Sequence, residues 1–183
     1  PMLRTLIPAL ALVALAFTGQ ITAPSPEIPA DVHPILVNTA DFEFIGATRC
    51  RTCHRKEEDG AQYDKWAASP HAEAYNVLAS DEAKAIAAEK GIANAQEADE
   101  CLACHVTGHG APAELLGSKY DMTEGVTCES CHGAGGSYYK KGDMEAIAAG
   151  TADNAALGYM EVNEATCTGC HNEESPTFEG FNY

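Results

Sequence analysis

The chain has 183 residues, with 27 acidic against 11 basic side chains and a formal net charge of −16 at pH 7. This length suits one domain. The acidic balance argues against nucleic acid as a partner, because phosphate binding needs a basic face.

The chain opens with an apolar stretch. Arg4 precedes an apolar run from Leu6 to Phe17, and Ile-Thr-Ala ends at Ala23 before Pro24. This pattern is typical of a secretory signal peptide cleaved after Ala23, and the run is short for a membrane span. The alternative is that residues 1–23 are retained as an arm that buries itself against a neighbouring subunit or a membrane.

Residues 24–45 are predicted to form an extended arm. Residues 21–38 are rich in proline, and their apolar residues do not recur with the period of a helix. Such a sequence is typical of a linker. His33 lies in it directly before Pro34, where extended backbone is favoured. Residues 46–183 are then the third predicted unit, a single domain.

All eight cysteines fall in four copies of the pattern C-x-x-C-H, which is the c-type haem attachment signature. Two thiols three residues apart can each add to a vinyl group on one porphyrin edge, and the next histidine is held under the iron as proximal ligand. The sequence therefore predicts four covalently bound haems c, attached through Cys50, Cys53, Cys101, Cys104, Cys128, Cys131, Cys167 and Cys170. The proximal ligands are then His54, His105, His132 and His171.

Two other uses of these cysteines are disulfides and zinc sites. Neither requires a histidine after every pair, and neither explains why no cysteine is left over.

Helices are predicted between the motifs. They cover residues 57–68, residues 70–79 after Ser69 as N-cap, residues 81–90 after Ser80 as N-cap with Gly91 as the stop, and a short stretch near residue 145. Large aliphatic side chains are few after Arg49, so the protein alone buries little apolar area. We expect a mainly α fold with extensive loops, a multihaem cytochrome c wrapped round four haems, with little or no sheet.

Three of the seven histidines remain as candidates for distal iron ligands: His33, His71 and His109. Four irons need eight imidazoles for complete bis-histidine ligation, so at least one iron lacks a second histidine from this sequence. His109 follows His105 by four residues, which span at most about 14 Å. We therefore expect His109 to ligate a different iron from His105; the alternative is a surface histidine.

His71 and His33 have their own alternatives. His71 lies in the first turn of a predicted helix, five residues after Trp66, and could instead be solvated there. His33 could be solvated in the arm, or the arm could carry it to a haem of another copy of the chain. Met122 and Met160 are weaker candidates, because methionine more often fills gaps between apolar surfaces.

The segments "CRTCHRKEEDGAQYDKWAASPHAEA", "CLACHVTGHG" and "EGVTCESCHGAGG" resemble the tetrahaem cytochrome c family typified by the electron acceptor of hydroxylamine oxidoreductase. The resemblance covers residues 46–175 and is most specific in the Trp66-to-His71 spacing and in residues 125–136. It implies closely packed haems, one of which can be five-coordinate, and His71 as a ligand of the third haem, on Cys128 and Cys131.

The chain departs from that family after the third motif, where "GSYYKKGD" contains no histidine to ligate the first haem. The arm with His33 is also similar to extracellular tetrahaem cytochromes that form filaments. In those polymers a histidine of one subunit ligates a haem of the next, and the similarity gives His33 that role.

The function expected from these features is electron transfer, as a subunit of an extracellular filament whose partners are other copies of itself and a redox donor and acceptor. An acidic carrier suits a basic redox partner, although acidity also aids solubility. Export is expected because c-type haem is attached outside the cytoplasm. A diffusible periplasmic shuttle is the first alternative.

A haem enzyme acting on a small nitrogen or sulfur species is the second alternative, because an iron with an open position can bind substrate. Against it, no lysine replaces a motif histidine, and no cluster of Arg, Tyr and His marks a proton-donating pocket. No catalytic residue is predicted. A structural or metal-storage role leaves the four motifs unexplained.

Overall fold

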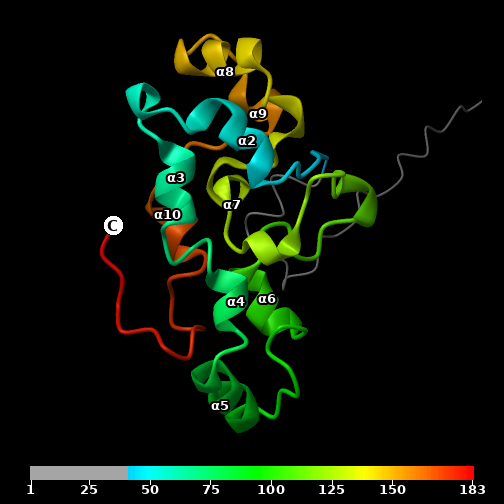
Figure 1. Cartoon of the computed structure of the whole chain (residues 1–183), viewed down its shortest axis with the longest axis vertical. Helices are drawn as coiled ribbons and strands as arrows, with labels where there is room; N and C mark the ends of the chain where they lie inside the picture. The colour runs from blue at the N-terminus through cyan, green and yellow to red at the C-terminus, as the bar shows by residue number, and fades with distance from the viewer. Residues whose placement is uncertain (1–40) are drawn as a thin grey trace, which may run out of the picture.

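The computed structural model describes residues 41–183. The predicted unit 1–23, most of the predicted arm and His33 lie outside the described residues. Within 41–183 the protein consists of helices and loops without a strand, and its only β-pairing is an isolated bridge between Phe44 and Leu116 (Figure 1). The prediction of a mainly α fold with extensive loops is confirmed for this part.

The helices are short. The α-helices are α2 (Ala47–His54), α3 (Gln62–Ala67), α4 (Ala74–Val77), α5 (Asp81–Glu89), α6 (Asp99–His105), α7 (Cys128–His132), α8 (Lys141–Ala148), α9 (Asn154–Leu157) and α10 (Glu164–Thr168). Four 3-10 helices join them: η1 (Glu57–Asp59), η2 (Ala113–Leu115), η3 (Met122–Glu124) and η4 (Gly135–Ser137). In residues 41–183 no helix has the length and apolar character that a membrane crossing requires.

Helix α5 forms as predicted. The Ser80 hydroxyl accepts a hydrogen bond from the Ala83 N–H, which satisfies one of the donors left free at a helix start. Gly91 follows the helix with a φ of 74°, a left-handed conformation that glycine adopts without steric cost. The short helix expected near residue 145 is α8.

Two predicted helices are wrong in extent. The stretch 57–68 is interrupted at Gly60 and Ala61, which have φ values of 100° and 49°, so it forms η1 and α3 separately. In the stretch 70–79 only α4 is an α-helix, and Ser69 does not cap it, because its hydroxyl donates to the Trp66 carbonyl at 2.7 Å.

The buried core is small. Leu78, Ala87, Leu102 and Val106 belong to a cluster between α4, α5 and α6. Phe44 and Ile45 are buried elsewhere in the domain. The last residues of the predicted arm are therefore part of the domain, because these two apolar side chains are removed from water within it.

The helices point in different directions and are distributed along the long axis of the molecule (Figure 1). Helix α8 is at one end with α2 beside it, α7 is near the middle, and α5 is at the opposite end. Helix α2 contacts α3 and α7, and α4 contacts α6 and η3. The four segments that carry C-x-x-C-H motifs are thereby distributed along the molecule.

Candidate haem-binding site

The first three C-x-x-C-H motifs are helical, and the fourth begins in the last residues of a helix. Helices α2, α6 and α7 end at the motif histidines His54, His105 and His132, whereas α10 ends at Thr168, inside the fourth motif. Residues three and four apart lie on one helix face. In the first three motifs the helical conformation thus places both cysteines of a pair and the following histidine on the same side.

The fold brings cysteines of different motifs together. The Cys50 thiol interacts with Cys128, and this hydrogen bond raises the pKa of Cys50 and lowers that of Cys128. A hydrogen bond between Cys104 and Cys170 lowers the pKa of Cys104 to about 7 and raises that of Cys170. The first motif therefore lies beside the third, and the second beside the fourth.

The third and fourth motifs are also near each other. Burial raises the pKa of Cys131, and the neighbouring Cys167 acts in the same direction. None of the eight cysteines is completely buried. Cysteines that lie close together in this way can attach haems that pack against one another.

His105 is oriented as a metal ligand. Its Nδ1 lies 2.6 Å from the Ala74 carbonyl oxygen. Because a carbonyl can only accept, Nδ1 carries the proton and Nε2 keeps its lone pair, which is the arrangement common to metal-bound histidines.

His132 also fits an iron ligand. Its Nδ1 is buried and has no hydrogen-bond partner within residues 41–183. Burial lowers the pKa of His132, an interaction with the Met160 backbone opposes the shift, and His54 adds to it; the net direction favours the neutral ring that metal binding requires. The ring stacks on Tyr159 with centroids 5.7 Å apart, which fixes its plane.

His71 lies next to the fourth motif. Its ring centroid is 6.0 Å from that of His171, and burial lowers the pKa of His71, with His171 adding to the effect. Two imidazoles on opposite sides of one metal ion have ring centres roughly 6 Å apart, since each nitrogen lies about 2 Å from the metal. The resemblance implied the third haem for His71, whereas this contact favours the fourth.

Trp66 explains how His71 is held. The indole Nε1–H donates to the Val126 carbonyl at 2.7 Å, and the Val126 N–H donates to the His71 carbonyl at 3.0 Å. Gly125 allows this approach, because its φ is 73° and a Cβ there would lie 2.7 Å from the His71 carbonyl oxygen. The spacing between Trp66 and His71 thus fits a backbone pairing with the segment before the third motif.

His109 lies beside α6, the helix of its own preceding motif. Its Nε2 is 3.1 Å from Asp99 Oδ1, and its side chain is 22 % exposed. Its expected role toward a different iron stays a prediction. Of the two methionines, Met160 lies at the third motif, where its N–H donates to the His132 carbonyl at 2.9 Å, and Met122 is exposed.

Glu129, inside the third motif, has a role that sequence reasoning missed. Its side chain is 1 % exposed and accepts hydrogen bonds from the N–H groups of Ile45 at 2.9 Å, Gly46 at 2.9 Å and Gly135 at 2.7 Å. Burial raises its pKa, and the three backbone donors oppose the shift. The only sequence signal is a charged residue between the two cysteines, and such a residue is ordinarily exposed.

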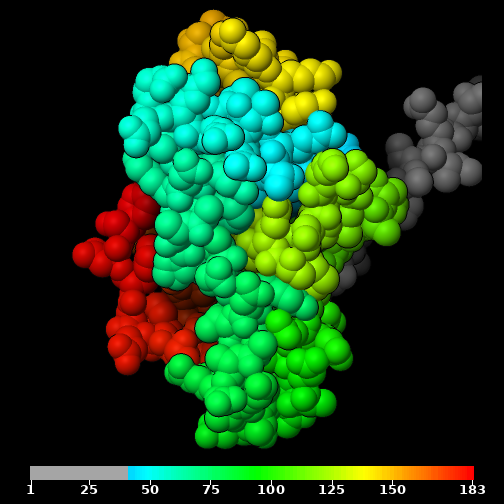
Figure 2. Space-filling view, in the orientation of Figure 1, coloured from blue at the N-terminus to red at the C-terminus, as the bar shows by residue number. Residues whose placement is uncertain are grey.

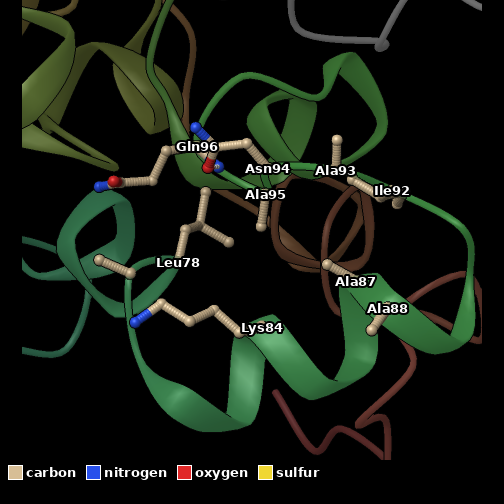
Figure 3. Close-up of a pocket in the computed structure, with 10 residues that line it drawn as sticks. Leu78, Lys84, Ala87, Ala88, Ile92, Ala93, Asn94, Ala95 and Gln96 are labelled. Atoms are coloured by element: carbon tan, nitrogen blue, oxygen red, sulfur yellow. Dashed lines mark hydrogen bonds between the residues drawn. The ribbon is translucent and has the colours of Figure 1, made fainter.

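A hollow of about 310 Å³ beside α5 is separate from the motifs (Figure 3). Alanines, Leu78, Ile92 and Lys84 line much of it, and no cysteine or histidine does. Within residues 41–183 no three His, Cys, Asp or Glu side chains gather as a metal site. The candidate site is therefore taken from the four C-x-x-C-H motifs themselves.

Comparison with known proteins agrees with the motifs. The family model described as cytochrome c554 and c-prime matches residues 49–133. The chain is also similar to cytochrome c-554 of Nitrosomonas europaea, with 31% identity over 153 residues, 77% of this chain and 63% of the relative. The chain thus spans less than two thirds of that relative's length. No solved structure matches. The two matches support covalently bound haem c as the group that the motifs hold.

Proposed function

We propose that this chain is a tetrahaem c-type cytochrome that carries electrons between redox partners and has no substrate of its own. The observation that carries the proposal is the set of four C-x-x-C-H motifs, which use every cysteine and lie beside one another in pairs. When bound, haem c supplies a one-electron carrier. The chain's own residues attach it, supply imidazoles and restrict its contact with water.

Haem counting tests this proposal. The full chain, produced in a host that matures c-type cytochromes, should give four haems by the pyridine haemochrome assay and an intact mass larger than the polypeptide by four haems. The double variant Cys50→Ala and Cys53→Ala should give three, and the control Thr52→Ala in the same motif should keep four. A chain with disulfides and fewer than four haems would contradict the proposal.

The distal ligands are a finer part of the proposal. The contact between His71 and His171 supports His71 as the distal ligand of the fourth haem. His109 is proposed for an iron other than that of the second motif, and His33 for a haem of a neighbouring copy. With seven histidines for eight axial positions, at least one iron then has a single imidazole.

Location and assembly are further parts of the proposal. Attachment of haem c outside the cytoplasm supports export. The filament expected from residues 1–45 is one form to test, and a diffusible periplasmic shuttle accounts for the motifs equally well. Electron cryo-microscopy of the untagged protein distinguishes them: filaments that disappear on removal of residues 1–35 support the first form, and discrete particles support the shuttle.

The histidine shortage favours one second candidate function, reduction of a small nitrogen or sulfur species at an iron with an open position. Electron paramagnetic resonance of the oxidised protein tests it. A high-spin ferric signal that changes on addition of nitrite or hydroxylamine would support this function. A signal that neither nitrite nor hydroxylamine changes would support electron transfer as the function, without this second one.

A further inference from the structure

Most of the chain's positive charge lies at one end of the molecule. Seven of its 11 lysines and arginines form what we call the basic face, and all seven are exposed. They are Arg49, Arg51, Arg55, Lys56, Lys65, Lys140 and Lys141. The first five fall within 17 residues of sequence around the first motif, although acidic residues outnumber basic ones in the whole chain.

Contacts between side chains join the three segments of the basic face. The Arg49 guanidinium lies 5.8 Å from the ring centroid of Tyr139, the residue before Lys140. The Arg51 guanidinium lies 5.7 Å from the ring of Tyr63 on α3. In Figures 1 and 2 α2 and α8 lie at one end of the molecule, and α5 with Lys84 lies at the other.

The arginines of this face are not neutralised by ion pairs. Its lysines make two, Lys56 with Glu58 at 3.9 Å and Lys141 with Glu145 at 3.5 Å. Among the described residues none of the three arginines pairs with a carboxylate. Exposed guanidinium groups bind carboxylates in a bidentate geometry, so they are suited to an acidic protein surface.

The charge of the face differs from that of the rest of the chain. Six acidic residues lie in the same segments: Glu57, Glu58, Asp59, Asp64, Asp143 and Glu145. Seven positive and six negative side chains give these segments a net charge of +1. The remainder of the chain then has a net charge of −17, because the whole chain has −16. An acidic partner is therefore repelled less by these segments than by the remainder of the chain.

The basic face coincides with the first haem motif. Arg49 and Arg55 flank the first motif, and Arg51 lies inside it, directly after Cys50. Cys53 is the only motif cysteine that is exposed, and the other seven are partly buried. Exposed arginines thus lie directly beside the attachment residues of this motif.

From these observations we propose that the basic face is a docking surface at which an acidic redox partner exchanges electrons with the haem of the first motif. The proposal rests on the proposed function and adds the entry or exit point and the charge of the partner. It reverses, for this end of the molecule, the expectation that an acidic chain takes a basic partner.

Charge reversal with anionic probes tests the proposal on the complete holoprotein. Arg51→Glu with Arg55→Glu changes the charge by −4 at the basic face. Lys84→Glu with Lys90→Glu makes the same change at the α5 end, next to the second motif. Redox-inert hexacyanochromate(III) serves as the binding probe in isothermal titration calorimetry. Hexacyanoferrate(III) serves as oxidant, and it takes one electron from a reduced haem and becomes hexacyanoferrate(II).

The arginine variant should bind hexacyanochromate(III) about tenfold more weakly and be oxidised about tenfold more slowly at low ionic strength. The lysine variant should change either quantity less than about twofold. Near 1 M salt the difference should disappear, because the Debye length falls to about 3 Å. The cationic oxidant hexaamminecobalt(III) should react faster with the arginine variant.

Equal effects of the two charge reversals would overturn the proposal, and so would anion binding that neither variant weakens. The haem count and the reductive titration of each variant are measured first. Four reducible haems with equal effects of charge reversal would overturn the docking surface alone. Absence of covalent haem would instead overturn the proposed function.

Discussion

Glu129 Oε2 accepts a hydrogen bond from the Gly46 N–H at 2.9 Å, although 83 residues separate the two. Glu129 belongs to the third motif, and Gly46 directly precedes α2, which carries the first. Glu124 continues the contact, because its Oε2 accepts from the Ala47 N–H at 2.9 Å. Carboxylates at the start of α2 satisfy donors that a helix leaves free and also favour its dipole. The first and third motifs are thereby held together by protein contacts as well as by proximity of their cysteines.

Replacing Glu129 with Gln should destabilise the holoprotein. The amide keeps the shape of the side chain but presents a donor where backbone N–H groups need acceptors. Because the side chain is 1 % exposed, we expect the free energy of unfolding to fall by about 1–3 kcal/mol. Thermal unfolding followed by far-ultraviolet circular dichroism measures it. The control Glu114→Gln, at an exposed glutamate, should leave the midpoint unchanged; an unchanged midpoint for Glu129→Gln would contradict the role.

Replacing Trp66 with Phe should loosen His71 without removing it. Phenylalanine keeps an aromatic ring but loses the Nε1–H that donates to Val126 at 2.7 Å. We expect a loss of about 1 kcal/mol in unfolding free energy and altered g-values of one low-spin haem. Electron paramagnetic resonance provides the second readout. A purely structural role for Trp66 would lower stability and leave every g-value in place.

Replacing His71 with Ala should convert one low-spin haem to high spin while all four haems stay attached. Because its ring contacts His171, we expect the fourth haem to be the one affected. The background Cys167→Ser with Cys170→Ser, which lacks that haem, separates the fourth haem from the third. In this background His71→Ala should create no further high-spin signal. If a new signal appears there, His71 ligates another haem, as the resemblance implied.

Local features of the fold could be predicted from the sequence, because neighbouring residues determine them. Ser80 and Gly91 bound α5 through a side-chain cap and a left-handed stop. The four C-x-x-C-H motifs also indicate haem c attachment without any information about the rest of the fold. These predictions depend only on residues a few positions apart.

The features that sequence reasoning missed depend on distant contacts. The helix expected over residues 70–79 starts only at Ala74. Before it the chain forms turns with i→i+3 hydrogen bonds, and the His71 carbonyl accepts from both the Ala74 N–H and the distant Val126 N–H. The sequence predicts no role for Glu129, whose carboxylate is bound by backbone N–H groups of residues 45–46 and of Gly135. The ring contact between His71 and His171 also depends on long-range packing, and it cannot be read from the spacing between motifs.

Tyr120 should make stability fall at alkaline pH. Its hydroxyl donates to the Thr107 carbonyl at 2.7 Å, and burial raises its pKa from about 10 to about 12, with the charges of Glu129 and Asp121 adding to the effect. The folded state therefore holds this proton more tightly than the unfolded state does. The raised pKa of Tyr120 contributes to the free energy of unfolding in full below about pH 10, and this contribution is lost as the pH rises through about 12.

Thermal unfolding midpoints measured from pH 9 to pH 12 check this effect in the wild type and in Tyr120→Phe. The wild-type midpoint should fall steeply above pH 10, and the variant, which cannot ionise there, should fall less. Some slope should remain, because burial also raises the pKa of Tyr138. Tyr183→Phe, at a tyrosine that is 67% exposed, is the matched control and should follow the wild type. Equal slopes for Tyr120→Phe and the wild type would show that the Tyr120 proton does not contribute to alkaline unfolding.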